Sequence, residues 1–125
     1  MDISGYYQTK KAFNEEAKNP KGMFSKELTE CDRLSIDYLK EYVQPWHKVL
    51  DIGCGMGNVI DSFNCERHGV DISEEMLEGC LNTYEIVGNM DELPYEDEMF
   101  DITFMIMTMQ HSKDREKTLS EMERV

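Results

Sequence analysis

Acidic residues and glycines at a characteristic spacing are the feature of this sequence that predicts chemistry. The run 51–57, DIGCGMG, directly follows an apolar stretch, and Asp71 comes about twenty residues after Asp51. Glycines let a ligand approach the backbone, and free amides at a following helix start suit a polar ligand. Asp51 can accept from an ammonium group, and Asp71 from two ribose hydroxyls. The pattern predicts nucleotide-type binding; the alternatives are a glycine turn that serves packing alone and a solvated Asp71.

Four short apolar stretches predict the strands that must position these residues. The strands are expected at about 48–52, 67–71, 84–87 and 100–107, with helices at about 58–63, from Ser73, and over 113–124. Alternating strands and helices indicate a parallel sheet covered on both faces. The predicted fold is an α/β, Rossmann-like three-layer sandwich with a central, mostly parallel sheet. In the last helix, Leu119 and Met122 are expected to face inward.

The first 45 residues have a different pattern, which is typical of helices. The sequence Asn-Pro-Lys-Gly at 19–22 predicts a turn, and apolar residues near helical spacing predict a second helix at about 25–42. Pro45 then closes this helix. We therefore expect an N-terminal helical segment, 1–45, followed by a core, 46–125.

Charge and composition exclude several classes of function. The 125 residues include 13 basic and 26 acidic ones, a net charge of −13, and the whole excess lies in 49–125. Such a charge opposes binding to nucleic acid or to an anionic membrane, and no apolar run reaches the roughly 18 residues of a membrane span. Four cysteines without a C-x-x-C pair and three separated histidines predict no metal site. The polar start is not a secretory signal, so we expect a cytoplasmic protein.

Three stretches together resemble a known family. Residues 49–59, 69–77 and 86–125 are similar to the class I S-adenosylmethionine-dependent methyltransferases of the small-molecule type. The most specific part is 87–101, VGNMDELPYEDEMFD, which resembles the loop after the family's third strand and the Phe-Asp opening of its fourth. An NAD-binding Rossmann domain shares the glycines and Asp71 but is not expected to show this loop. An NAD-binding oxidoreductase fragment is therefore the less favoured alternative.

The resemblance implies S-adenosylmethionine as the cofactor, with S-adenosylhomocysteine as the product, and it assigns roles to the glycine-rich loop. Asp51 and the backbone of Gly53, Cys54 and Gly55 would hold the methionine part of the cofactor. Asp71 would accept from the ribose hydroxyls, and Ile72 would flank the adenine. These assignments follow from the resemblance, residue by residue.

The later strands supply the other implied cofactor residues. Asn89 stands where the family usually has Asp, and its carbonyl oxygen can still accept from the adenine amino group. The backbone amide of Met90 would meet the ring edge, and Met107 would lie near the sulfonium.

Two further assignments have alternatives of equal weight. His111 would face the acceptor as a general base, or it would only shape the loop where it lies. Tyr6 and Tyr7 would belong to an N-terminal lid or cap over the cofactor, or they would be core aromatics on a helix.

The resemblance ends with the last predicted helix, before the family's remaining strands. We therefore expect a C-terminally incomplete core in which the strand at 100–107 has a bare edge. Such an edge is a template for pairing with another chain, so a homodimer is expected through it. The predicted function is methyl transfer to a small-molecule acceptor by direct displacement, without nucleic-acid or membrane partners. The alternative is a non-catalytic module that binds S-adenosylmethionine or S-adenosylhomocysteine.

Overall fold

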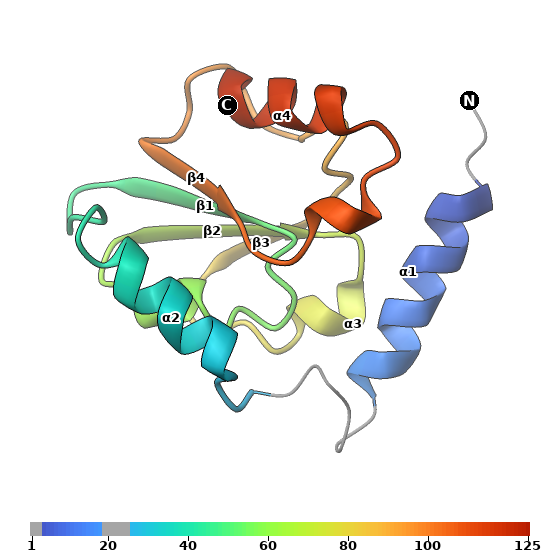
Figure 1. Ribbon diagram of the computed structural model, residues 1–125, viewed down its shortest axis with the longest axis horizontal. Coiled ribbons are helices and arrows are strands. Elements are labelled where there is room, and N and C mark those ends of the chain that lie inside the picture. Colours follow the sequence, from blue (N-terminus) through green and yellow to red (C-terminus); the bar gives the residue numbers. More distant parts are fainter. Residues whose placement is uncertain (1–3, 19–25) are drawn as a thin grey trace.

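A computed structural model describes the backbone of residues 4–18 and 26–125 and the side chains of residues 10–18 and 26–125 (Figure 1). The helices are α1 (Ser4–Ala17), α2 (Glu30–Leu39), α3 (Glu74–Leu77) and α4 (Arg115–Arg124). The strands are β1 (Lys48–Ile52), β2 (Glu66–Asp71), β3 (Tyr84–Val87) and β4 (Ile102–Met105). Two short 3-10 turns complete the order, η1 (Ile60–Ser62) and η2 (Met109–His111).

The four strands form one parallel sheet in the order β3-β2-β1-β4. Asp51 on β1 is paired with Gly69 on β2 and with Phe104 on β4. Because all four strands run in the same direction, their carboxyl ends and the loops that follow lie at one edge of the sheet. The α/β Rossmann-like fold with a parallel central sheet is confirmed.

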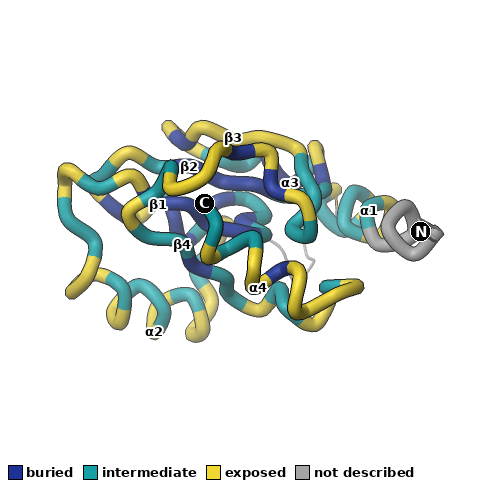
Figure 2. Tube along the Cα trace, turned by 90° about the horizontal axis from the view of Figure 1, so that it is seen from above, coloured by how far each residue is buried: buried dark blue, intermediate teal, exposed yellow. Residues whose placement is uncertain are grey.

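The two faces of β1 explain the layers. Val49 belongs to one buried cluster, which the α2 side chains Ile36 and Leu39 help to cover. Leu50 and Ile52 belong to the other, to which Met122 of α4 contributes. Figure 1 shows α2 and α4 on opposite sides of the sheet, and Figure 2 shows the buried residues of β1 and β2 in dark blue. The predicted three-layer arrangement therefore follows from a central strand that is apolar on both faces.

The fourth strand was predicted too long. It spans Ile102–Met105 rather than 100–107. Before it, the amide of Phe100 donates to the carbonyl of Val125 at the end of α4, which takes Phe100 out of the sheet. After it, Met107 has a left-handed backbone with φ of 53°, so the chain turns there.

Two helices also begin later than predicted, α2 at Glu30 rather than about 25 and α4 at Arg115 rather than 113. α2 begins at Glu30 because Thr29 and Asp32 form a capping box: the Asp32 amide donates to Thr29 Oγ1 at 3.1 Å, and the Thr29 amide donates to Asp32 Oδ2 at 2.9 Å. The turn predicted at 19–22 lies outside the described residues. The helix predicted at 58–63 is only the short turn η1.

In α4 the expected orientation of Leu119 is wrong, since 54% of its surface is exposed. Thr118 is fully buried instead, and its hydroxyl contacts the Asp91 carboxylate and the Ser112 hydroxyl. These polar contacts fix which side of the helix faces the protein, while Met122 packs inward as expected. No helix in the described part of the chain is long and apolar enough to span a membrane.

Candidate functional site

A cavity of about 810 Å³ opens at the carboxyl ends of the strands. It is lined by the glycine-rich loop after β1, the end of β2, and the segments after β3 and β4. Ten residues singled out in the sequence line it: Asp51, Gly53, Cys54, Gly55, Asp71, Ile72, Asn89, Met90, Met107 and His111. Tyr6 and Tyr7 lie on α1, but their side chains are outside the described residues. The fold thus brings together residues from four separate parts of the chain.

The glycine-rich loop is held to the neighbouring strand by its backbone. The amides of Gly53 and Cys54 both donate to the carbonyl of Val70, at 2.7 and 3.2 Å. Gly53 has φ of +76°, and a Cβ there would lie 2.3 Å from Cγ2 of Thr108, so glycine is needed for the close approach of the turn after β4. A Cβ on Gly55 would meet nothing within 4 Å. The open space on this side of the Gly55 backbone leaves room for a ligand.

Asp71 is fixed by two backbone amides. Its Oδ2 accepts from Gly55 at 2.9 Å and its Oδ1 from Ser73 at 3.0 Å. Burial raises the pKa of Asp71, and these amides, with that of Ile72 and the nearby His111, oppose the rise. Because each carboxylate oxygen has two lone pairs, both oxygens can accept one further hydrogen bond from a ligand hydroxyl.

Asp51 is a buried acid on which three other acids act electrostatically. Only 4% of its surface is exposed. Burial raises the pKa of Asp51 well above its usual range, and the charges of Asp71, Asp32 and Asp61 raise it further. A positive group in the cavity would relieve this repulsion, since an opposite charge favours the ionised carboxylate.

The loop after β3 uses the Asn89 side chain for its own shape. Asn89 Oδ1 accepts from the Asp91 amide at 2.9 Å, and Asn89 pairs with Glu92 in an isolated antiparallel bridge. The amide oxygen therefore has one lone pair left for a ligand. Met90 lines the cavity and also packs against the cluster around Leu50.

The segment after β4 forms the open side of the cavity. Met107 is 71% exposed and left-handed, a backbone conformation that costs of the order of 1–3 kcal/mol for a residue other than glycine and that clusters at functional sites. His111 lies on η2, exposed, with its ring 5.1 Å from that of Phe13 on α1 in an edge-to-face arrangement. The histidine is accessible from solvent and also lines the cavity.

Four residues of the N-terminal part, for which the sequence predicted no site role, line the same cavity: Phe13, Thr29, Cys31 and Asp32. Thr29 followed three residues later by Asp32 is a capping-box pattern, which indicates that a helix begins there. Nothing in the sequence placed that helix start beside β1. Among the described residues, no group of three or more His, Cys, Asp or Glu side chains is arranged to hold a metal ion.

The chain is similar to known methyltransferases. Residues 50–125 match the family described as "Methyltransferase domain". The chain is 34% identical over 91 residues to the uncharacterized methyltransferase YcgJ of Bacillus subtilis, covering 63% of this chain and 36% of that protein. It is 31% identical over 91 residues to ajmaline N-methyltransferase of Rauvolfia serpentina, covering 62% of this chain and 31% of that protein.

Solved structures show the same fold. The YcgJ structure superposes with a TM-score of 0.67 at 29% identity, covering 76% of this chain and 45% of that one. A methyltransferase of Thermotoga maritima, described as a possible histamine N-methyltransferase, superposes with a TM-score of 0.66 at 22% identity. The superposition covers 95% of this chain and 51% of that one. The chain thus spans 36% and 31% of the two curated relatives and about half of these structures.

Proposed function

Because the chain belongs to the class I S-adenosylmethionine-dependent methyltransferase family, we propose that it binds S-adenosylmethionine and transfers the methyl group to a small-molecule acceptor by direct displacement. The observation that carries the proposal is that the glycine-rich loop, Asp51 and Asp71 line the same cavity. The acidic balance of this half of the chain argues against nucleic-acid and membrane partners.

The residues present fit this cofactor. Asp51 suits the ammonium group of the methionine part, since the charges of Asp71, Asp32 and Asp61 raise its pKa and a positive ligand group would oppose them. Gly55 offers open space beside its backbone. Asp71 has lone pairs for two hydroxyls, and Asn89 has one for the adenine amino group. Each role is one that the sequence analysis assigned to the same residue.

The cofactor, when bound, supplies a methyl group on a sulfonium that is already an activated donor. The chain's own residues therefore need only to bind, orient and shield the reactants. Holding two reactants in a reactive orientation lowers the barrier by roughly 7–11 kcal/mol. Met107 and His111 lie on the segment after β4 that lines the open side of the cavity. We propose that the acceptor enters there and that His111 accepts its proton where the acceptor carries one.

The class of acceptor is proposed only as a small molecule. The relatives differ in this respect, since one is named an ajmaline N-methyltransferase and another the sterol 24-C-methyltransferase of Schizosaccharomyces pombe. We propose a cytoplasmic location, in which the four free cysteines stay reduced.

A non-catalytic binding module is the second candidate function. The observation behind it is that the glycine-rich loop, Asp51 and Asp71 line one cavity, which is enough for cofactor binding whether or not a methyl group is transferred. A module of this kind would bind the cofactor without an acceptor pocket. An NAD-binding oxidoreductase fragment is disfavoured by the family match.

The deciding experiment is methyl transfer from radiolabelled S-adenosylmethionine to a panel of amines, phenols and thiols, run beside calorimetry with S-adenosylhomocysteine. Binding with transfer supports the enzyme, and the His111→Ala variant should then lose turnover while keeping cofactor affinity. Binding without transfer to any acceptor supports the module. Absence of binding contradicts both.

A further inference from the structure

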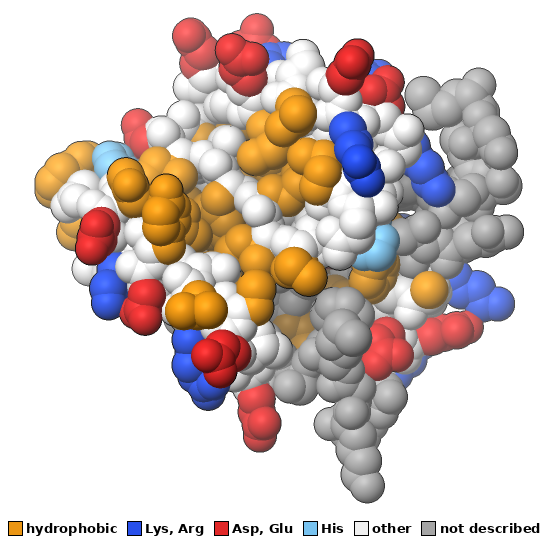
Figure 3. All heavy atoms as spheres, in the orientation of Figure 1, with side chains coloured by type: hydrophobic (Ala, Val, Ile, Leu, Met, Phe, Trp, Pro, Cys, Tyr) orange, Lys and Arg blue, Asp and Glu red, His pale blue; other side chains and the backbone are white. Residues whose placement is uncertain are grey.

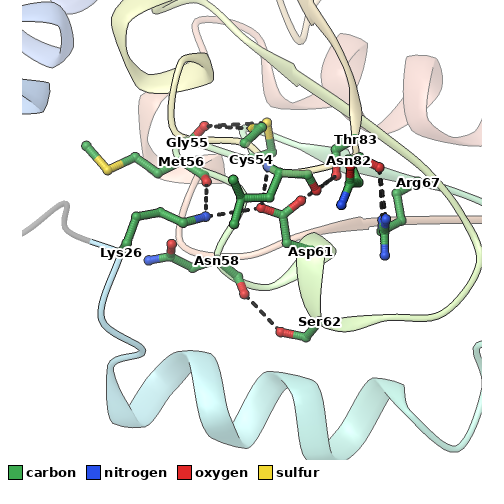
Figure 4. A network of polar contacts seen from close by, with 12 residues as sticks. Lys26, Cys54, Gly55, Met56, Asn58, Asp61, Ser62, Arg67, Asn82 and Thr83 are labelled. Atoms are coloured by element: carbon green, nitrogen blue, oxygen red, sulfur yellow. Dashed lines mark hydrogen bonds and ion pairs between the residues drawn. The ribbon is translucent and has the colours of Figure 1, made fainter.

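We infer that Lys26 and Asp61 form a latch that holds the start of α2 against the glycine-rich loop, which makes Lys26 a positioning residue for the cofactor cavity. The ammonium group of Lys26 donates to the backbone carbonyl of Met56 at 2.8 Å and to Asp61 Oδ2 at 3.1 Å (Figure 4). Met56 belongs to the glycine-rich loop and lines the cavity. One side chain therefore joins the N-terminal part of the chain to the loop directly.

Asp61 is held in place to receive this lysine. Its side chain is only 11% exposed. Oδ2 also accepts from the Leu81 amide at 2.8 Å, and Oδ1 accepts from the Thr83 hydroxyl at 2.5 Å. A Cβ on Gly57 would lie 2.9 Å from Oδ2, so the carboxylate lies directly against the loop. The acidic half of the latch is thus a fixed part of the core.

The latch determines where part of the cavity lining lies. Lys26 is followed closely by Thr29, Cys31 and Asp32, all of which line the cavity. The capping box joins two of these lining residues, Thr29 and Asp32, and the contact of Lys26 lies three residues before it, so we infer that this contact holds them beside the loop. Asp32 is also close enough to Asp51 to act on it electrostatically. Releasing Lys26 would therefore loosen one side of the cavity without removing any residue from it.

The latch has a clear limit on its strength. The Lys26 side chain is 41% exposed, and exposed ion pairs contribute little on their own. This inference rests on the proposed function. We therefore expect the loss of the Lys26 contacts to lower the affinity of the chain for the cofactor. We expect the Lys26→Met variant to bind S-adenosylhomocysteine about fivefold more weakly than the wild type. The loss should come with a small change in thermal stability.

The chain offers a matched control. Lys40 donates to Asp37 Oδ1 at 2.9 Å, and neither residue lines the cavity. Lys40→Met removes the same charge from the same part of the chain and should leave affinity unchanged. Lys26→Arg keeps a donor and a positive charge, so it should restore most of the affinity. Equal losses in Lys26→Met and Lys40→Met would show a general charge effect and overturn the inference.

A second readout keeps the test independent of ligand binding. Hydrogen exchange of the ligand-free protein should be faster in Lys26→Met than in wild type over residues 26–33 and 55–61, and unchanged in Lys40→Met. If the wild type binds no S-adenosylhomocysteine, the proposed function fails while the exchange result still decides the latch. If exchange over both ranges is the same in Lys26→Met and wild type, Lys26 positions nothing and the inference is wrong.

Discussion

The backbone amide of Gly55 donates to Oδ2 of Asp71 at 2.9 Å, and this bond joins the glycine-rich loop after β1 to the end of β2. Since Asp71 Oδ1 accepts from Ser73 as well, one carboxylate fixes both the loop and the start of α3. The two elements that the sequence marked as a nucleotide-type site are therefore already assembled by the chain itself.

Replacing Asp71 should weaken cofactor binding strongly. In Asp71→Ala the ribose hydroxyls would lose a charged acceptor, at a cost of about 1.5–3 kcal/mol. Calorimetry with S-adenosylhomocysteine measures this. Glu78→Ala, an exposed acid just after α3, is the control for charge and should bind like the wild type. Unchanged affinity in Asp71→Ala would show that the ribose site is misplaced.

Asp51 should stabilise the protein with the cofactor bound and destabilise the ligand-free protein. Its folded-state pKa is raised, so the folded chain holds a proton that the unfolded chain releases once the pH exceeds about 4. Stability should therefore fall as the pH rises from about 4 through the raised pKa. Asp51→Asn removes this cost and should raise the melting temperature of the ligand-free protein at pH 7.

The same variant should bind S-adenosylhomocysteine less tightly, because it cannot supply a negative charge to the ammonium group. Thermal unfolding across pH 4–8, with and without ligand, checks both effects. A melting temperature of Asp51→Asn below that of wild type at pH 7 would contradict the account of a repelled, buried acid.

Replacing Gly53 or Gly55 of the loop by alanine should lower the stability of the fold by different amounts. Both have positive φ, which strains an alanine, but only at Gly53 would the new Cβ strike Thr108. Gly53→Ala should destabilise the fold by more than the roughly 1 kcal/mol expected for backbone strain alone at Gly55→Ala. Urea unfolding of the two variants measures the difference. Equal losses would mean that the contact with Thr108 relaxes freely.

Arg124 should contribute to stability through its contacts with the loop after β3. Its guanidinium donates to the carbonyls of Tyr95 and Leu93 at 2.8 and 3.0 Å and pairs with Glu121, whose pKa it lowers. Arg124→Met should cost about 1–3 kcal/mol in the free energy of unfolding. Arg115→Met, an exposed arginine at the start of the same helix, should cost little. A similar loss in both variants would exclude a specific role for Arg124.

Self-association through β4 stays a prediction. β4 is an edge of the described sheet, and apolar side chains gather over this face between α4 and α2 (Figure 3). Leu119 and Met107 are among the exposed ones, at 54% and 71%. Light scattering at micromolar concentration should show a dimer, and Leu119→Lys should shift it toward monomer. A monomeric wild type would contradict the prediction.

The sequence was a good guide wherever short-range pattern decides structure. The run Val49-Leu50-Asp51-Ile52 reads as a buried strand and is one, because a central parallel strand is apolar on both faces. The placement of Asp51 and Asp71 at one edge followed from parallel topology. Phe100 and Leu119 were misplaced because long-range hydrogen bonds, from Phe100 to Val125 and from Thr118 to Asp91, decide their positions.

The lining residues of the N-terminal part were missed for the same reason. Thr29, Cys31 and Asp32 reach the cavity only because the chain before α2 packs beside the loop, where Lys26 contacts Met56. Such a contact joins residues 30 positions apart and leaves no periodic trace in the sequence. Local pattern shows that a helix begins near Thr29 but not what lies next to it.

Calorimetric titration of the wild-type chain with S-adenosylhomocysteine, and separately with NAD, tests the central claim most directly. We expect saturable one-to-one binding of S-adenosylhomocysteine and no measurable heat with NAD. Binding of NAD but not of S-adenosylhomocysteine would contradict the assignment of this cavity to the methyltransferase cofactor.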